Sequence, residues 1–163
     1  MGKYSTQIKT IYACHGIVSI ENNAFYDCNN LTTLVIPSTV TSIGSYAFNE
    51  CNSLTTVAMA EGVIEIGKFA FGSCKKLKAV VIPASVISIG EYVFYNCRVL
   101  TKAIMPEGIT EIKEATFKDC VKLKIVKIPE TVTKIGDLAF NCCDSLEEIT
   151  IPASVSSIIS NPF

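Results

Sequence analysis

The sequence predicts a solenoid, in which successive coils of the chain stack along one axis with little or no α-helix. Cysteine recurs at one constant interval, with a phenylalanine three positions before it and a leucine three positions after it. These six cysteines are Cys28, Cys51, Cys74, Cys97, Cys120 and Cys143. A fixed period of about 20–50 residues is typical of proteins in which each coil packs only on its neighbours.

The period covers almost the whole chain, so residues 1–163 are predicted to form one domain. A partial first coil begins near Ile8, because Ile8, Ile11 and Ala13 fill positions that leucine and isoleucine hold one period later. Six coils of this period follow, and the last is incomplete because Phe163 falls in the phenylalanine position. We expect polar residues before the first coil to shield its open end: Lys3, Ser5, Thr6 and Gln7.

Each coil is predicted to begin with a short strand. Residues 31–36 read LTTLVI, so Leu34 and Ile36 point inward while Thr33 and Val35 point outward. The same phase recurs in every later coil, down to Ile149 and Ile151. Stacked strands make a parallel sheet along one side, and proline ends most of them because it cannot donate to the ladder. These prolines are Pro37, Pro83, Pro106, Pro129 and Pro152.

A second inward pair predicts a short strand or extended segment on the opposite side of each coil. It runs from Val40 and Ile43 to Val155 and Ile158. The next position holds Gly44, Gly67, Gly90 and Gly136, which indicates a backbone angle that other residues adopt at a cost. Lys113 stands there in one coil, so Lys113→Gly is expected to stabilise by about 1 kcal/mol if the position is left-handed. The following A-F-x-x-C stretch is too short for a helix and predicts a turn or 3₁₀ segment.

The complete coil reads L-x-x-[LV]-x-[IM]-P-x-x-V-x-x-I-G-x-x-A-F-x-x-C-x-x, with SYAFNEC at residues 45–51 as a clear example. This pattern resembles the BspA-like subclass of leucine-rich repeats. The resemblance implies a horseshoe-type leucine-rich-repeat solenoid with stacked parallel strands and short turns. It also implies adhesion or host-protein binding at a cell surface, with no catalysis by the repeat.

Outward residues of the main sheet are free of packing demands, so any recognition is expected on this concave face. Val35, Ala58, Val81 and Ile104 would form an exposed apolar strip of the kind that marks partner sites. Simple strand preference is the alternative explanation. The candidate binding residues are Thr33, Val35, Thr56, Ala58, Ala79, Val81, Lys102, Ile104, Ile125 and Lys127.

Basic residues cluster where three successive coils approach the main sheet. The basic edge consists of Lys75, Lys76, Lys78, Arg98, Lys122 and Lys124, and with Lys102 and Lys127 it holds eight of the 14 basic residues. It would attract an acidic protein, a glycan or a phosphorylated ligand. The alternative is a solvated edge that protects repeated strands from aggregation. A separate column of Tyr46, Phe69 and Tyr92 is expected to be ring packing, with sugar or protein contact as the alternative.

Overall charge and motif content exclude several function classes. The net charge is −1 with a pI near 5.8, so no global field favours nucleic acid, and no apolar run is long enough to span a membrane. The sequence holds no nucleophile elbow or phosphate loop, and its single histidine, His15, cannot build a zinc site with Cys14 alone. We therefore predict a non-enzymatic module without metal or cofactor that binds a protein or glycan. A cytosolic scaffold, or an array that self-associates through its coil ends, is the alternative.

The cysteines bear on the compartment of the protein. The six repeated thiols are expected to be buried and unpaired, whereas Cys14 and Cys142 should be exposed and react first with a thiol reagent. Unpaired thiols fit a reducing compartment, and the segment from Met1 to Ala13 lacks the apolar core of a secretory signal. The family resemblance points instead to a cell surface, so both locations stay open.

Overall fold

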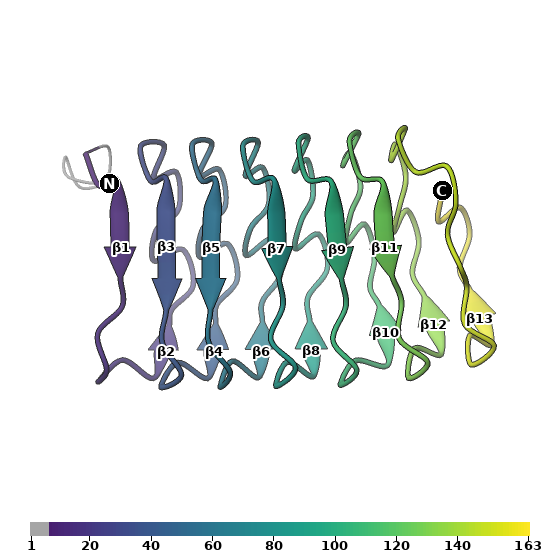
Figure 1. The fold of residues 1–163 in the computed structure, drawn as a ribbon, viewed down its shortest axis with the longest axis horizontal. Helices are drawn as coiled ribbons and strands as arrows, with labels where there is room; N and C mark the ends of the chain where they lie inside the picture. Colours follow the sequence, from purple (N-terminus) through teal and green to yellow (C-terminus); the bar gives the residue numbers. More distant parts are fainter. Residues whose placement is uncertain (1–6) are drawn as a thin grey trace.

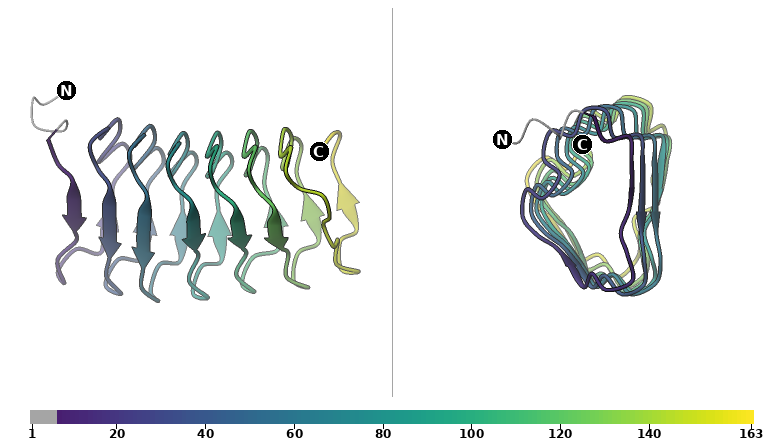
Figure 2. Two further views of the ribbon diagram at one scale, coloured as in Figure 1. Left: turned by 45° about the horizontal axis from the view of Figure 1, so that its top comes forward. Right: turned by 90° about the vertical axis from the view of Figure 1, so that its left-hand side faces the viewer.

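The computed structural model describes residues 7–163 as a stack of coils along one axis (Figure 1). Viewed along that axis, the coils nearly superimpose around a common interior (Figure 2). These residues contain strands and turns but no helix, as the repeat predicted. Within the expected polar shield, Gln7 is exposed, and Lys3, Ser5 and Thr6 lie outside the described residues.

The main sheet forms from the first strand of each coil, where inward and outward residues alternate as expected. Leu34, Ile36 and Val57 are buried in the interior. Every parallel pair joins residues one repeat period apart, such as Leu34 with Val57. The strands are β1 (Thr10–Tyr12), β3 (Thr33–Ile36), β5 (Thr56–Met59), β7 (Ala79–Val81), β9 (Lys102–Ile104) and β11 (Ile125–Lys127).

The main sheet is interrupted, which the repeat did not predict. Its hydrogen-bonded ladder runs β1-β3-β5 and then β7-β9-β11, with no pairing between β5 and β7. Thr55 donates both its N–H and its hydroxyl to the Thr32 carbonyl of the preceding coil. Lys78, which takes the threonine position at the break, has no hydroxyl to make the second bond. Lys124 also lacks the hydroxyl but keeps its N–H bond at 3.0 Å, so losing the hydroxyl weakens the junction without being enough to open it.

The last coil departs from the prediction for the main sheet. The strand predicted at Ile149 and Ile151 is missing, so that expectation was wrong. Glu147 takes the threonine position in this coil and cannot donate a hydroxyl to the coil before it. Both isoleucines are only half-buried, which agrees with the looser packing of a terminal coil.

The second side of each coil carries the short strand that the sequence allowed. Each has two residues, of which the isoleucine points inward in most coils. In the last coil, however, Ile158 is exposed and Val155 only half-buried, so the predicted inward pair is not buried there. The strands are β2 (Ser19–Ile20), β4 (Ser42–Ile43), β6 (Glu65–Ile66), β8 (Ser88–Ile89), β10 (Glu111–Ile112), β12 (Lys134–Ile135) and β13 (Ser157–Ile158).

The repeated glycine position is required by close approach and not by backbone angle, so the left-handed interpretation was wrong. Among the described glycines, only Gly62 has a positive φ. A Cβ at Gly90 would lie 2.5 Å from the Lys68 nitrogen of the preceding coil, and one at Gly67 would lie 2.6 Å from the Ser45 nitrogen. Glycine therefore lets successive backbones touch at this corner.

Lys113 interrupts the second sheet at this same position. Gly90 donates its N–H to the Ile66 carbonyl at 2.8 Å, and the other glycines make the equivalent bond. Lys113 makes no such bond to Ile89 in the described chain, and the ladder breaks between β8 and β10. Ile159, in the last described coil, keeps the bond at 2.9 Å. This coil has a neighbouring coil on one side only, so it can shift to make room for the Cβ of Ile159.

The phenylalanines form one continuous column, as the repeat predicted. Phe48 and Phe71 have ring centroids 5.5 Å apart, and Phe71 and Phe94 are 6.0 Å apart, with nearly parallel planes. Phe163 continues the column at 5.8 Å from Phe140. Offset parallel rings at these distances are a favourable packing arrangement.

The A-F-x-x-C segment is a series of turns, which was one of the two predicted forms. Tyr46 and Glu50 have φ values of 58° and 63°, in the left-handed region that side chains rarely adopt. With these backbone angles, every second N–H group points toward the next coil, where Phe48 donates to the Ala70 carbonyl at 2.8 Å. The left-handed backbone angles thus occur at Tyr46 and Glu50, whereas the glycines allow the close approach of successive coils at the neighbouring corner.

Candidate binding surfaces

The outward face of the main sheet presents apolar side chains over its later strands. Val81 is 73% exposed, Ile125 55% and Ile104 40%. Val81 and Ile104 are register partners on β7 and β9, so their side chains are neighbours. Val35, predicted to belong to the exposed strip, is only half-buried, as is Thr33. The open apolar surface therefore lies toward β7, β9 and β11. The other predicted face residues, all exposed, are Thr56, Ala58, Ala79, Lys102 and Lys127.

All residues of the basic edge are exposed. The ion pairs found among residues 7–163 join Lys68 with Glu91 and Lys134 with Glu111, both away from this edge. Arg98 donates from its Nε to the Asn96 amide oxygen at 2.8 Å, a neutral partner. Within residues 7–163, the basic edge therefore forms no ion pair.

A groove of about 540 Å³ crosses the basic edge at the start of β5, β7 and β9. It adjoins the break in the main sheet, where β5 and β7 are not paired. Three lysines from three successive coils line it together with threonine and valine residues. The lining residues are Thr55, Lys76, Lys78, Val99, Thr101 and Lys122.

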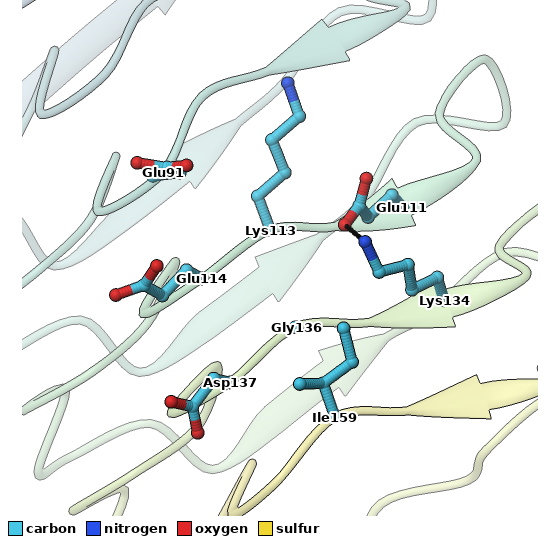
Figure 3. Close-up of a pocket in the computed structure, with 8 residues that line it drawn as sticks. All are labelled: Glu91, Glu111, Lys113, Glu114, Lys134, Gly136, Asp137 and Ile159. Atoms are coloured by element: carbon cyan, nitrogen blue, oxygen red, sulfur yellow. Dashed lines mark ion pairs between the residues drawn. The ribbon is translucent and has the colours of Figure 1, made fainter.

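A second hollow of about 410 Å³ lies at the glycine corner, around the break made by Lys113 (Figure 3). Glu91, Glu114 and Asp137 occupy one position in three successive coils and line it. The Tyr92 hydroxyl donates to Glu114, and this bond raises the pKa of Tyr92 to about 12. Within the described residues, no group of three acidic, histidine or cysteine side chains is arranged to hold a metal ion. The hollow thus combines half-buried, hydrogen-bonded acids with the ladder break between β8 and β10.

The surface aromatic column is a stack, which agrees with the packing interpretation. Phe69 lies between Tyr46 at 5.0 Å and Tyr92 at 4.6 Å, measured between ring centroids. The Lys68 ammonium lies 5.4 Å from the centre of the Tyr92 ring. Both faces of the Phe69 ring are therefore covered, so a sugar cannot stack on either of them.

Thiol exposure follows the sequence prediction. The six repeated cysteines are buried, and Cys14 and Cys142 are exposed. Burial raises the pKa of Cys51 to about 12, so this thiol stays protonated at neutral pH. Nothing in the residue pattern indicates that each repeated thiol from the second coil onward also donates a hydrogen bond, as Cys51 does to the Phe25 carbonyl at 3.3 Å.

The stacked parallel strands define a leucine-rich-repeat solenoid. A family model described as BspA type leucine rich repeat region matches six copies over residues 3–99 and 53–163. The chain belongs to this family. No curated protein matches it. Within residues 7–163, no helix has the length and apolar character needed to cross a membrane.

Solved structures with this fold come from several bacteria. A leucine rich cell surface protein from Faecalibacterium prausnitzii is 36% identical with a TM-score of 0.85, over 94% of this chain and 44% of that protein. The chain thus spans less than half of that relative. The T. pallidum leucine rich repeat protein is 27% identical with a TM-score of 0.63, over 81% and 72% of the two chains. A leucine-rich repeat protein from Eubacterium ventriosum, 22% identical over 92% and 57% with a TM-score of 0.62, shares the fold.

Proposed function

We propose that this chain is a non-catalytic binding module that holds a protein or glycan partner against the outward face of β7, β9 and β11, at a cell surface. The observation that carries the proposal is the exposure of Val81, Ile104 and Ile125 on adjacent strands. Apolar side chains gathered in one exposed patch are typical of a partner site.

The composition of the patch supports a specific contact. Lys102 pairs with Ile125 across β9 and β11, and Lys127 pairs with Ile104. Apolar centres bordered by charged side chains resemble the core and rim of protein interfaces. The interior offers few reactive groups, because the buried side chains among the described residues are hydrophobic apart from the six repeated thiols, Asn49 and Thr116. The cell-surface location follows by analogy from the relative in F. prausnitzii, which is called a cell surface protein.

The test is a binding screen with a matched control. Purified chain is applied to a glycan array and to a panel of immobilised extracellular-matrix proteins. The same screen is run with the variant Val81→Glu, Ile104→Glu, Ile125→Glu. The control variant places the same charges on exposed apolar residues away from the main sheet, namely Val18→Glu, Ile64→Glu and Ile87→Glu.

We expect at least one ligand that the unmodified chain and the control variant retain and the face variant loses. The mass of each protein in solution is measured in parallel, so that self-association is recognised. Equal binding by the face and control variants would contradict the use of this face. A screen without any ligand, or a ligand that is simply a second copy of the chain, would contradict the binding role.

A further inference from the structure

We propose that the groove across the basic edge binds a linear sulfated polysaccharide through Lys76, Lys78 and Lys122. This site lies where β5, β7 and β9 begin, next to the apolar face of the proposed function but lined by different residues. Its ligand class follows from charge, spacing and the chemistry of the lining, which are considered in turn.

The first argument is unbalanced charge. Lys76, Lys78 and Lys122 are exposed, and none of them belongs to an ion pair found among residues 7–163. The chain as a whole carries a net charge of −1, so this local excess is opposite to the overall balance. Like charges held side by side repel one another unless a polyanion or salt screens them. An anionic ligand would therefore gain from each lysine that it approaches.

The second argument is spacing along the axis. Lys76 and Lys122 occupy the same repeat position two coils apart, and Lys78 lies two residues after Lys76, at the start of the next coil. Parallel strands are spaced by about 4.8 Å, so the backbones of Lys76 and Lys122 lie roughly 10 Å apart. With their side chains extended outward, the lysines offer separate positions for anionic groups. A polymer with anionic groups repeated along its length matches that spacing.

The third argument is the lining between the lysines. Val99, Thr55 and Thr101 line the groove, and no aromatic ring does. The two threonine hydroxyls already donate to carbonyls of the preceding coils. Sites for single-stranded nucleic acid combine positive charge with aromatic rings on which bases stack. A groove with lysines and small aliphatic groups lacks that platform and fits a sulfated sugar chain, whose contacts are mainly ionic.

Binding to the groove is tested with heparin as the probe. The affinity is measured by isothermal titration calorimetry or surface plasmon resonance at several salt concentrations. Desulfated heparin and a single-stranded oligonucleotide of similar charge are the comparison ligands. The groove variant is Lys76→Gln, Lys78→Gln, Lys122→Gln. The control variant, Lys68→Gln, Lys118→Gln, Lys134→Gln, removes the same number of positive charges elsewhere.

We expect heparin binding that weakens with added salt and falls by about tenfold or more in the groove variant, with a change of about twofold or less in the control. Equal losses in both variants would reduce the effect to net charge and overturn the proposal. Equal binding of desulfated heparin, tighter binding of the oligonucleotide, or no heparin binding would also overturn it. The face variant Val81→Glu, Ile104→Glu, Ile125→Glu should still bind heparin. That result would show that the groove binds its ligand independently of the apolar face.

Discussion

The Cys97 thiol donates a hydrogen bond to the carbonyl oxygen of Phe71, 26 residues earlier in the chain, at 3.2 Å. The repeated cysteine therefore does two things at once. It fills a small space in the apolar interior, and it provides a donor to a buried carbonyl of the preceding coil. Buried carbonyls without a partner are unfavourable, which gives a physical reason for cysteine in place of alanine.

Cys97→Ala is predicted to lower the free energy of unfolding by about 1–3 kcal/mol, because the Phe71 carbonyl loses its partner inside the core. Urea denaturation followed by circular dichroism measures the change. Cys14→Ala is the control, since Cys14 is exposed, and it should change stability by less than about 0.5 kcal/mol. Equal stability of the two variants would mean that the thiol bond contributes nothing.

Stability is predicted to fall in alkaline solution. Burial raises the pKa of Cys97 from 9.0 to about 12 in the folded chain. The unfolded chain then loses the thiol proton at lower pH than the folded chain. The stabilisation is complete below about pH 8 and is lost as the pH rises from about 9 toward 12.

The contribution of Cys97 has to be separated from that of other groups, because the raised pKa values of Tyr26 and Tyr92 also lower stability as the pH rises. Urea denaturation between about pH 7 and pH 11 should therefore show a steeper decline for the unmodified chain than for Cys97→Ala. Parallel curves would show that Cys97 does not contribute to the alkaline loss.

The glycine corner gives a third prediction. A Cβ at Gly67 would lie 2.6 Å from the Ser45 nitrogen and 2.7 Å from the Gly44 carbonyl carbon, which are backbone atoms that cannot rotate away. Gly67→Ala should therefore destabilise by about 1–3 kcal/mol through overpacking. Gly16→Ala is the matched control, since no atom lies within 4 Å of the added Cβ. A melting temperature for Gly67→Ala equal to that of the control would exclude close approach as the reason for glycine.

The repeat period was enough to predict the solenoid, the inward residues of most strands and the phenylalanine column, because stacking places equivalent residues in equivalent environments. It could not predict where the ladders break. Lys78 replaces the threonine of its coil, and Lys113 replaces the glycine of its coil. Whether a coil can shift to accommodate such a replacement depends on the coils next to it. The wrong assignment at the glycine position has a similar origin, since a sequence shows that glycine recurs but not whether angle or space requires it.

The candidate surfaces could be predicted only in part, because exposure also depends on how neighbouring coils are arranged. Alternation along a strand correctly places Val81 and Ile104 outside the core, but it cannot tell an exposed outward residue from a half-buried one such as Val35. The basic edge is visible in the sequence as charge. Its groove is not, because the hollow is formed by side chains of three coils beside the unpaired strands β5 and β7, an arrangement that the sequence alone does not show.

Replacing Lys113 with glycine should close the break between β8 and β10. Without a Cβ, the residue 113 N–H can approach the Ile89 carbonyl as Gly90 approaches Ile66, at 2.8 Å. The added hydrogen bond contributes about 0.5–1.5 kcal/mol, while glycine costs about 0.5–1 kcal/mol in backbone entropy. The melting temperature should therefore change little, and the direct sign of closure is slower hydrogen exchange at residue 113. Lys113→Ala is the control, because it removes the charge and keeps the Cβ. Equally slow exchange in both variants would assign the break to the lysine side chain beyond its Cβ, and unchanged exchange in Lys113→Gly would show that the gap has another cause.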